Sequence, residues 1–293
     1  MAAVTAVSEP AATAAAAARP KPWLRVAFAV AGLELLVLFA PTVAWLYERW
    51  TMSVWHNAHG LFIPPLVAYL VYGELQRTRQ RPAASSAWGF AFLVPALLLH
   101  ALDAGMHTQL LSAVALVVAL PGLALLLIGL ERTRAIAFPL AFMLFALPIP
   151  LAFTEQIHLT LRQLVTAVTS SALPLLGVPV FVEGTTLHMA SGAIEIADAC
   201  SGFSTLYAAM AVAFLVAYSA PTVRHRALVL LAAAPLAIAA NILRVFGLIV
   251  LALWQGYGIL DTFVHPLSGL LTFALALPAI FWLGTDRRAS VRA

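Results

Sequence analysis

The chain has 293 residues, of which 63% are hydrophobic and only 10% are charged. This composition excludes a soluble globular domain, and apolar runs of about 20 residues indicate a protein that crosses a membrane several times as helices. The formal net charge is +4, but the basic residues are scattered between apolar runs, so they orient membrane spans rather than bind nucleic acid.

Residues 1–22 are rich in Ala and Pro and predict a disordered tail without the apolar core of a cleavable signal peptide. The rest of the chain predicts one all-α polytopic membrane domain, residues 23–285, followed by a short tail, 286–293. The eight predicted spans are residues 23–46, 60–75, 87–102, 110–130, 135–153, 200–218, 227–254 and 266–284.

Every second connection between these spans is basic. The basic clusters precede the first span and follow the second, fourth, sixth and eighth spans: Arg19, Lys21, Arg25; Arg77, Arg79, Arg81; Arg132, Arg134; Arg224, Arg226; and Arg287, Arg288. The positive-inside rule therefore places both termini in the cytoplasm, in agreement with an even number of spans.

The long connection, residues 150–199, begins with an amphipathic pattern that predicts a helix lying along the membrane surface. Its apolar residues are Ile157, Leu161, Leu164, Val165 and Val168. Strand-like residues then flank a turn at Glu183 and Gly184, which predicts a small β-hairpin that covers the site described next.

Cys200, the single cysteine, stands where this connection becomes the sixth span. A lone cysteine in an apolar helix is usually a small core residue. A helix N-terminus, however, favours the thiolate, and Asp198 and Ser201 lie close by in the sequence. We interpret Cys200 as a nucleophile and expect Asp198 to balance the charge of Arg244.

Arg244 lies 18 residues after Arg226, a distance of roughly 27 Å along a helix. That is close to the hydrocarbon thickness of about 30 Å, so Arg244 is predicted at the outer end of its span, level with Cys200. It either reaches the interface as an anchor, or holds an oxyanion, lowers the thiol pKa or binds a carboxylate.

His265 opens the last span, with Pro266 predicted at the first helical position and His265 as the cap. Alone it reads as an interfacial histidine, but beside Cys200 it is a candidate general acid and base. His59 opens the second span and suits substrate positioning or a structural role. Four further histidines are interpreted as interfacial: His100, His107, His158 and His188.

Several of these segments together resemble the exosortase/archaeosortase family. The matching pieces are His59-Gly60 with Ile63-Pro64, Leu147-Pro148-Ile149-Pro150, Leu175-Leu176-Gly177-Val178, Ala199-Cys200-Ser201-Gly202, Asn241-Ile242-Leu243-Arg244, and His265 before Gly269. The resemblance implies a membrane transpeptidase of the PEP-CTERM type of sorting system, with Cys200, Arg244 and His265 catalytic. It implies substrates tethered to the membrane by a C-terminal sorting signal, made of a short motif, a hydrophobic helix and a basic tail.

The sequence thus predicts a cysteine peptidase or transpeptidase of the bacterial cytoplasmic membrane, with its active site at the extracytoplasmic face. His59, Asp198, Ser201 and Asn241 are expected to support the site or bind substrate, and neither a metal nor a cofactor is expected. The acceptor, an amine or water, stays open. The alternative is a non-enzymatic component of polysaccharide export or transport, which would place polar residues through the middle of the bilayer.

Overall fold

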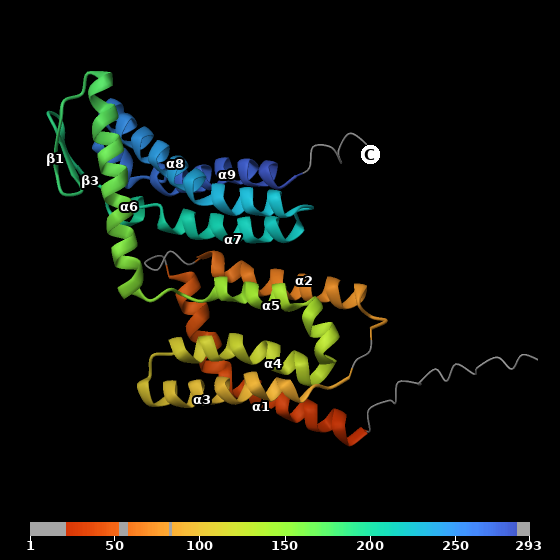
Figure 1. The fold of residues 1–293 in the computed structure, drawn as a ribbon. Helices are drawn as coiled ribbons and strands as arrows, with labels where there is room; N and C mark the ends of the chain where they lie inside the picture. The colour runs from red at the N-terminus through yellow and green to blue at the C-terminus, as the bar shows by residue number, and fades with distance from the viewer. Residues whose placement is uncertain (1–21, 53–57, 82–83, 286–293) are drawn as a thin grey trace, which may run out of the picture. The chain divides into compact units, whose positions relative to one another are not determined.

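The computed structural model describes residues 22–52, 58–81 and 84–285 (Figure 1). The predicted tail 286–293, and all of the predicted tail 1–22 except Pro22, lie outside these residues. The chain divides into two compact units. The first comprises Met1–Trp45 and Glu74–Ile136, and the second comprises Leu46–Gly73 and Ala137–Ala293.

The first unit is built on the pair α3 (Phe90–Met106) and α4 (Leu110–Ala135), with η3 (Ala87–Gly89) leading into α3. Small side chains let the two helices approach closely. The buried cluster between them also takes in a side chain of α1 (Pro22–Thr51), and its members are Phe39, Leu93, Ala96, Ala115 and Ala119.

Helix α4 is interrupted at Gly129, close to where the predicted span 110–130 ends. Gly129 has φ 77°, and a Cβ added there would lie 1.9 Å from the carbonyl oxygen of Ala84, so only glycine fits. Beyond this break Arg132 donates hydrogen bonds to the carbonyl oxygens of Arg79 and Arg81, at 2.8 Å each. The basic connections after the second and fourth predicted spans are therefore joined by hydrogen bonds from an arginine side chain to backbone carbonyl oxygens.

Four helical segments among the described residues are long and apolar enough to cross a membrane. They are Ala87–Met106, Leu110–Ala135, Val223–Gln255 and Val264–Gly284, and they overlap four of the eight predicted spans. The chain is also helical across most of three further predicted spans, in α1, α2 (Ile63–Arg77) and α7 (Phe203–Ser219). The protein is thus a mostly helical membrane protein.

The predicted span 135–153 differs most from the structure. It contains α5 (Ala137–Phe142) and η4 (Met143–Ala146), after which the backbone leaves the helix. Pro148 and Pro150 follow directly, and proline has no N–H to continue a helix. The next helix, α6 (Leu151–Ala172), starts at once. The helical segment 137–146 is therefore shorter than the ~20 residues that a span needs.

Helix α6 is the predicted amphipathic helix, but its buried face differs in part from the predicted one. Leu161 and Val165 are buried, whereas Ile157, Leu164 and Val168 are each about 40% exposed. Threonines take the remaining buried positions of the helix: Thr154, Thr166 and Thr169. An apolar stripe of α6 is therefore left on the outside, as expected for a helix at a membrane surface.

The predicted β-hairpin is present and gains a third strand. Strands β1 (Val180–Glu183), β2 (Thr186–Met189) and β3 (Gly192–Glu195) form an antiparallel sheet in the order β1-β2-β3. Both connections are two-residue turns, and Gly184 in the first turn has φ 60°. The third strand extends the sheet toward Cys200.

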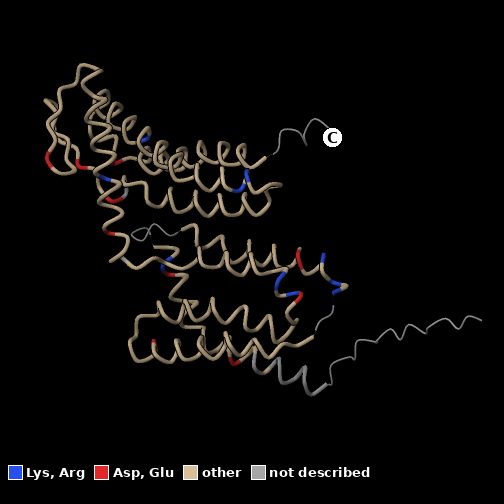
Figure 2. The backbone as a smooth tube through the Cα atoms, viewed as in Figure 1, with Lys and Arg blue, Asp and Glu red and all other residues tan. Residues whose placement is uncertain are grey.

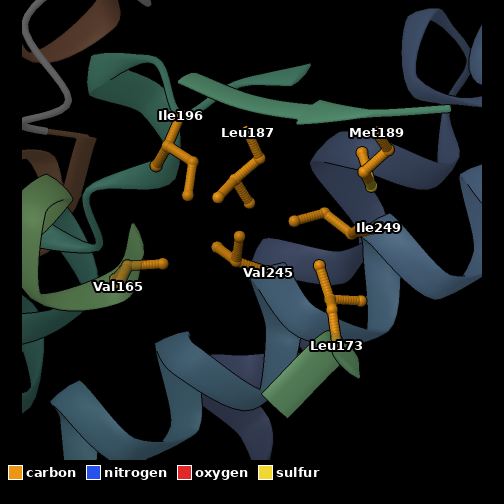
Figure 3. Packing of buried hydrophobic residues seen from close by; sticks show 7 residues of the cluster. All are labelled: Val165, Leu173, Leu187, Met189, Ile196, Val245 and Ile249. Atoms are coloured by element: carbon orange, nitrogen blue, oxygen red, sulfur yellow. The ribbon is translucent and has the colours of Figure 1, made fainter. Parts of the chain in front are cut away.

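One face of this sheet packs on α8 and α6, as Figure 3 shows. Leu187 and Met189 of β2 and Ile196 after β3 point toward Val245 and Ile249 of α8. Val165 and Leu173 complete the buried cluster. This apolar contact fixes the segment that leads into Cys200 against α8.

Three helices follow the sheet: α7 (Phe203–Ser219), α8 (Val223–Gln255) and α9 (Val264–Gly284), with η7 (Tyr257–Asp261) between the last two. They lie side by side, and α6 runs across one end of the group (Figure 1). Alanines fill most of their shared core: Ala209, Ala213, Ala233 and Ala237. Charged residues lie mostly at helix ends and in the sheet, which leaves long stretches of helix uncharged (Figure 2).

Candidate active site

Cys200 lies in a tight turn before α7 rather than in its first turn. It ends η6 (Asp198–Cys200), and its backbone N–H donates to the carbonyl oxygen of Ala197 at 2.9 Å. Helix α7 starts three residues later, at Phe203. The thiol thus lies in the turn before the helix N-terminus, and the effect of the helix dipole on the thiolate stays a prediction.

Gly202 makes this turn possible. Its φ is 81°, and a Cβ added there would lie 2.3 Å from Cγ of Asn241. Any other residue would suffer both the left-handed backbone and the collision with α8. The glycine after Cys200-Ser201 is thus required by the close approach of Asn241.

Asn241 ties the turn to α8. It is only 2% exposed, and its Nδ2 donates to the carbonyl oxygen of Cys200 at 3.0 Å. Its Oδ1 accepts from Nη1 of Arg244 at 3.4 Å. A buried amide with both ends hydrogen-bonded fixes the position of its partners, so Asn241 orients both the cysteine backbone and the arginine.

His265 is the nearest polar partner of the thiol: Sγ of Cys200 and Nε2 of His265 are 3.1 Å apart. The histidine lies in the first turn of α9, which begins at Val264. It is therefore not the N-cap that was predicted. The N-cap is Phe263, and Oγ1 of Thr262 accepts from the N–H of Val264 at 3.3 Å. Pro266 still lies in the first turn, where a missing N–H is harmless.

Arg244 is held by α9 as well as by Asn241. Its Nε donates to Oγ of Ser268 at 2.8 Å, and that hydroxyl donates to the carbonyl oxygen of His265 at 2.6 Å. The side chain lines an apolar groove of about 520 Å³ between α8 and α9. Arg244 is thus connected to the backbone of His265 through a single hydroxyl.

The expected pairing of Asp198 with Arg244 is wrong. Oδ1 of Asp198 lies 3.3 Å from Nε of Arg162 on α6, as an ion pair without hydrogen-bond alignment. Asp198 stands on the α6 side of the turn, whereas Arg244 approaches from α8. Among the described residues, Arg244 forms no ion pair with a carboxylate, and its hydrogen-bond partners are the neutral Ser268 and Asn241.

The pKa of Cys200 is set by two opposing effects. Burial raises the pKa of the thiol above its ordinary value, and the positive charge of Arg244 opposes this rise. The thiol is therefore predominantly protonated at neutral pH. Formation of the nucleophile requires transfer of this proton, and His265 is within reach to accept it.

A cavity of about 280 Å³ opens onto the thiol and the imidazole. Besides Cys200 and His265, its lining comprises residues 194–197 at the end of β3, three apolar residues of α8, and Leu260 and Asp261 of η7. Among the residues that the structure describes, no group of three or more His, Cys, Asp or Glu side chains is placed to hold a metal ion. The chemistry available at this cavity is that of a thiol, an imidazole and two carboxylates.

His158, predicted to be an interfacial residue, contacts the turn that carries Cys200. Nδ1 of His158 lies 2.8 Å from Oγ of the buried Ser201, and that hydroxyl accepts from the N–H of Phe203 at 3.3 Å. His158 and Arg162 are four residues apart on α6, so both reach the same turn. This i, i+4 spacing is the one signal in the sequence that would have indicated their shared face.

His59 lies apart from the thiol, against α7. Its ring is 4.8 Å from that of Tyr207, which is seven residues beyond Cys200. Burial lowers the pKa of His59 to about 4, so it is neutral at physiological pH. The adjacent Gly60 packs against the Trp50 indole, which an added Cβ would meet at 2.3 Å. These contacts indicate a structural role for the His59-Gly60 element.

The fold and this geometry define a membrane protein with a thiol–imidazole pair at one end of a helical group. The family model described as transmembrane exosortase (Exosortase_EpsH) matches residues 50–282 of the chain. The chain belongs to this family. Neither a curated protein nor a solved structure matches it.

Proposed function

We propose that this chain is a membrane-embedded cysteine peptidase or transpeptidase that cleaves a C-terminal sorting signal from exported proteins. The observation that carries the proposal is the 3.1 Å approach of the Cys200 sulfur to Nε2 of His265 at a cavity. A nucleophile within hydrogen-bonding reach of a base is the arrangement that covalent catalysis requires. Family membership supports a membrane transpeptidase.

In the proposed reaction, Nε2 of His265 accepts the proton of the Cys200 thiol, and the thiolate attacks the scissile carbonyl. The tetrahedral intermediate collapses as the peptide C–N bond breaks, and His265 returns the proton to the leaving amine. The resulting thioester is attacked by an acceptor amine or by water, which His265 deprotonates in turn. Cys200 leaves as the thiol, and no net oxidation occurs.

Arg244 supplies the fixed positive charge of the site. Its contacts with Ser268 and Asn241 orient the guanidinium, and its charge favours the thiolate. We assign it to stabilisation of the oxyanion or to orientation of the substrate. Asn241, Ser201 and Asp198 hold the Cys200 turn in this proposal.

The decisive experiment compares Cys200→Ala with the wild type. The assay follows an exported protein that ends in a hydrophobic helix and a basic tail, co-expressed with the enzyme, and scores loss of the tail by immunoblot. Cys200→Ala is expected to abolish processing while still accumulating in the membrane, and Cys200→Ser to be nearly as poor because a serine hydroxyl ionises far less readily. Full processing by Cys200→Ala would favour the transport alternative instead.

The proposal includes eight spans within a single membrane domain, residues 23–285, of which the fifth is only partly helical. Both termini lie in the cytoplasm and the cavity lies outside. The alternation of basic connections supports this orientation. Single cysteines at Arg79, Thr133 and Arg224, in a Cys200→Ala background, should resist membrane-impermeant thiol reagents in intact cells, and one at Glu183 should react. Labelling at Arg79 would reverse the orientation.

A further inference from the structure

The three-stranded sheet has an open edge at β3. In its pairing with β2, Leu187 lies opposite Ile194 and Met189 opposite Gly192. The two-residue turn makes Met189 and Gly192 a hydrogen-bonded pair, and such pairs alternate along the ladder. The backbone N–H of Ile196, bonded to the carbonyl oxygen of Thr185 at 3.0 Å, follows this alternation.

The backbone groups of Ala193 and Glu195 therefore point away from β2. The carbonyl oxygen of Glu195 accepts from the N–H of Ala197 at 3.1 Å. The N–H and C=O of Ala193 and the N–H of Glu195 are left directed at the free edge. Such an edge is a ready template for another strand.

This edge leads into the cavity that holds the thiol. Four consecutive residues, 194–197, line the same cavity as Cys200 and His265. The strand is also held in place at both ends. Oγ of Ser191 lies 2.8 Å from the hydroxyl of Tyr257 before β3, and Ile196 is buried after it. Because the strand is already fixed, its outward N–H and C=O groups can bind a partner without a further cost in conformational entropy.

We propose that β3 binds the scissile segment of the substrate as an added fourth strand, through the main-chain groups of Ala193 and Glu195. The added strand places a carbonyl of the substrate beside Sγ of Cys200. This inference rests on the proposed function and specifies its substrate as an extended, strand-forming peptide. Recognition by edge addition takes its affinity from main-chain hydrogen bonds, and so it tolerates many side chains.

The length of the edge determines the probe for the test. Strand β3, Gly192–Glu195, spans about 13 Å at the usual rise per residue of a strand, which matches a segment of four residues. The probe is therefore acetyl-tetraalanine chloromethyl ketone, in which the Cys200 sulfur displaces chloride and forms a thioether. Iodoacetamide, which has no peptide backbone to pair, reports the intrinsic reactivity of the same thiol.

The variant Ala193→Pro removes the outward N–H of Ala193 and leaves the ladder with β2 intact, since proline is tolerated at an edge. The matched control is Val182→Pro on β1. Val182 lies opposite Leu187 in a pair without hydrogen bonds, so its N–H also points outward, but at the edge that does not line the cavity.

Ala193→Pro is expected to slow labelling of the purified full-length protein by the peptide probe about tenfold, the loss of roughly one net hydrogen bond. Its labelling by iodoacetamide should be unchanged, and Val182→Pro should match the wild type with both reagents. Equal peptide labelling in Ala193→Pro and the wild type would overturn the proposal.

A second measurement on the wild type keeps the proposal testable if Ala193→Pro does not fold. The probe is methylated at its backbone nitrogens, so that it cannot donate to β3, and it should label Cys200 about tenfold more slowly than the parent probe. Equal rates for the two probes would also overturn the proposal. Neither measurement depends on substrate cleavage. A failure of the proposed function would instead appear as continued processing in Cys200→Ala, so the two failures can be distinguished.

Discussion

The two compact units bury polar side chains in different ways. In the first unit, Asp103 of α3 is 1% exposed, and its carboxylate accepts from the hydroxyls of Thr108 and Ser112. It also accepts from the backbone N–H groups of Gln109 and Ser112. All of these partners lie within nine residues, so Asp103 holds the connection between α3 and α4 together.

In the second unit, the buried polar groups are gathered from distant parts of the chain. Cys200 and His265 are 65 residues apart, Asn241 and Cys200 are 41 apart, and His158 and Ser201 are 43 apart. The first contact reaches a sulfur that lines a cavity, and the other two hold the turn that carries this sulfur. A buried polar group that bonds only to nearby residues of the chain thus indicates a structural role. Contacts from distant residues that meet around a reactive atom indicate a functional site.

The largest effect on turnover that we predict for a conservative change is that of Arg244→Lys. Lysine keeps the charge but cannot reproduce the fork that contacts both Ser268 and Asn241. Turnover of the co-expressed substrate should fall roughly 10²-fold, the scale of losing one oxyanion donor. Near-normal cleavage at matched enzyme levels would leave Arg244 as an interfacial anchor.

The pH profile of Cys200 alkylation by iodoacetamide is the control that separates the effect of the Arg244 charge from the effect of its guanidinium geometry. Arg244→Lys should leave the profile close to that of the wild type. Arg244→Gln should move it to higher pH, because burial then raises the thiol pKa unopposed and less thiolate forms at any given pH. An unmoved profile in Arg244→Gln would show that the charge does not reach the sulfur.

Gly202→Ala tests, through the free energy of unfolding, whether Asn241 holds the Cys200 turn. Gly177→Ala is its matched control. Both glycines have φ close to 80°, but a Cβ at Gly177 meets nothing within 4 Å, whereas one at Gly202 meets Asn241. We expect Gly177→Ala to cost about 1–2 kcal/mol for the backbone conformation. Gly202→Ala should cost a further ~1–3 kcal/mol for the collision.

The measurement for this pair is thermal unfolding of the purified variants in detergent micelles. Equal destabilisation by the two substitutions would mean that Asn241 of α8 moves aside for the added methyl group at no cost in stability. The Cys200 turn would then not be clamped by α8, and the comparison between the two units would lose its strongest structural support.

The smallest expected effect on turnover is that of Asp103→Asn. An amide cannot accept all the hydrogen bonds that the carboxylate accepts, so the free energy of unfolding should fall by about 1–3 kcal/mol. Cleavage by the folded fraction should stay within about twofold of the wild type. A loss comparable to that of Arg244→Lys would give the first unit a part in the reaction.

The proximity of the site residues could be predicted from the sequence. Counting residues along α8 placed Arg244 level with Cys200 and His265, and the structure brings these residues together around Asn241 and Ser268. Depth along a helix follows from a fixed rise per residue and from the hydrocarbon thickness. The turn pattern before Cys200 likewise predicted strands, because short runs of β-branched residues between glycines favour them.

The partners of those residues could not be predicted. Asp198 pairs with Arg162 rather than Arg244, His158 meets Ser201, and the buried face of α6 is partly threonine. Each depends on how far a helix is rotated about its axis, and packing against distant elements sets that rotation.

The sequence by itself determined that this protein spans a membrane, and it predicted that a thiol, a guanidinium and an imidazole come together. Composition and the repeat of the helix suffice for that, because both act locally. The tertiary structure alone decided that His265 is the group next to the sulfur and that β3 borders the cavity. Those facts arise from packing between segments far apart in the chain, which no local pattern encodes.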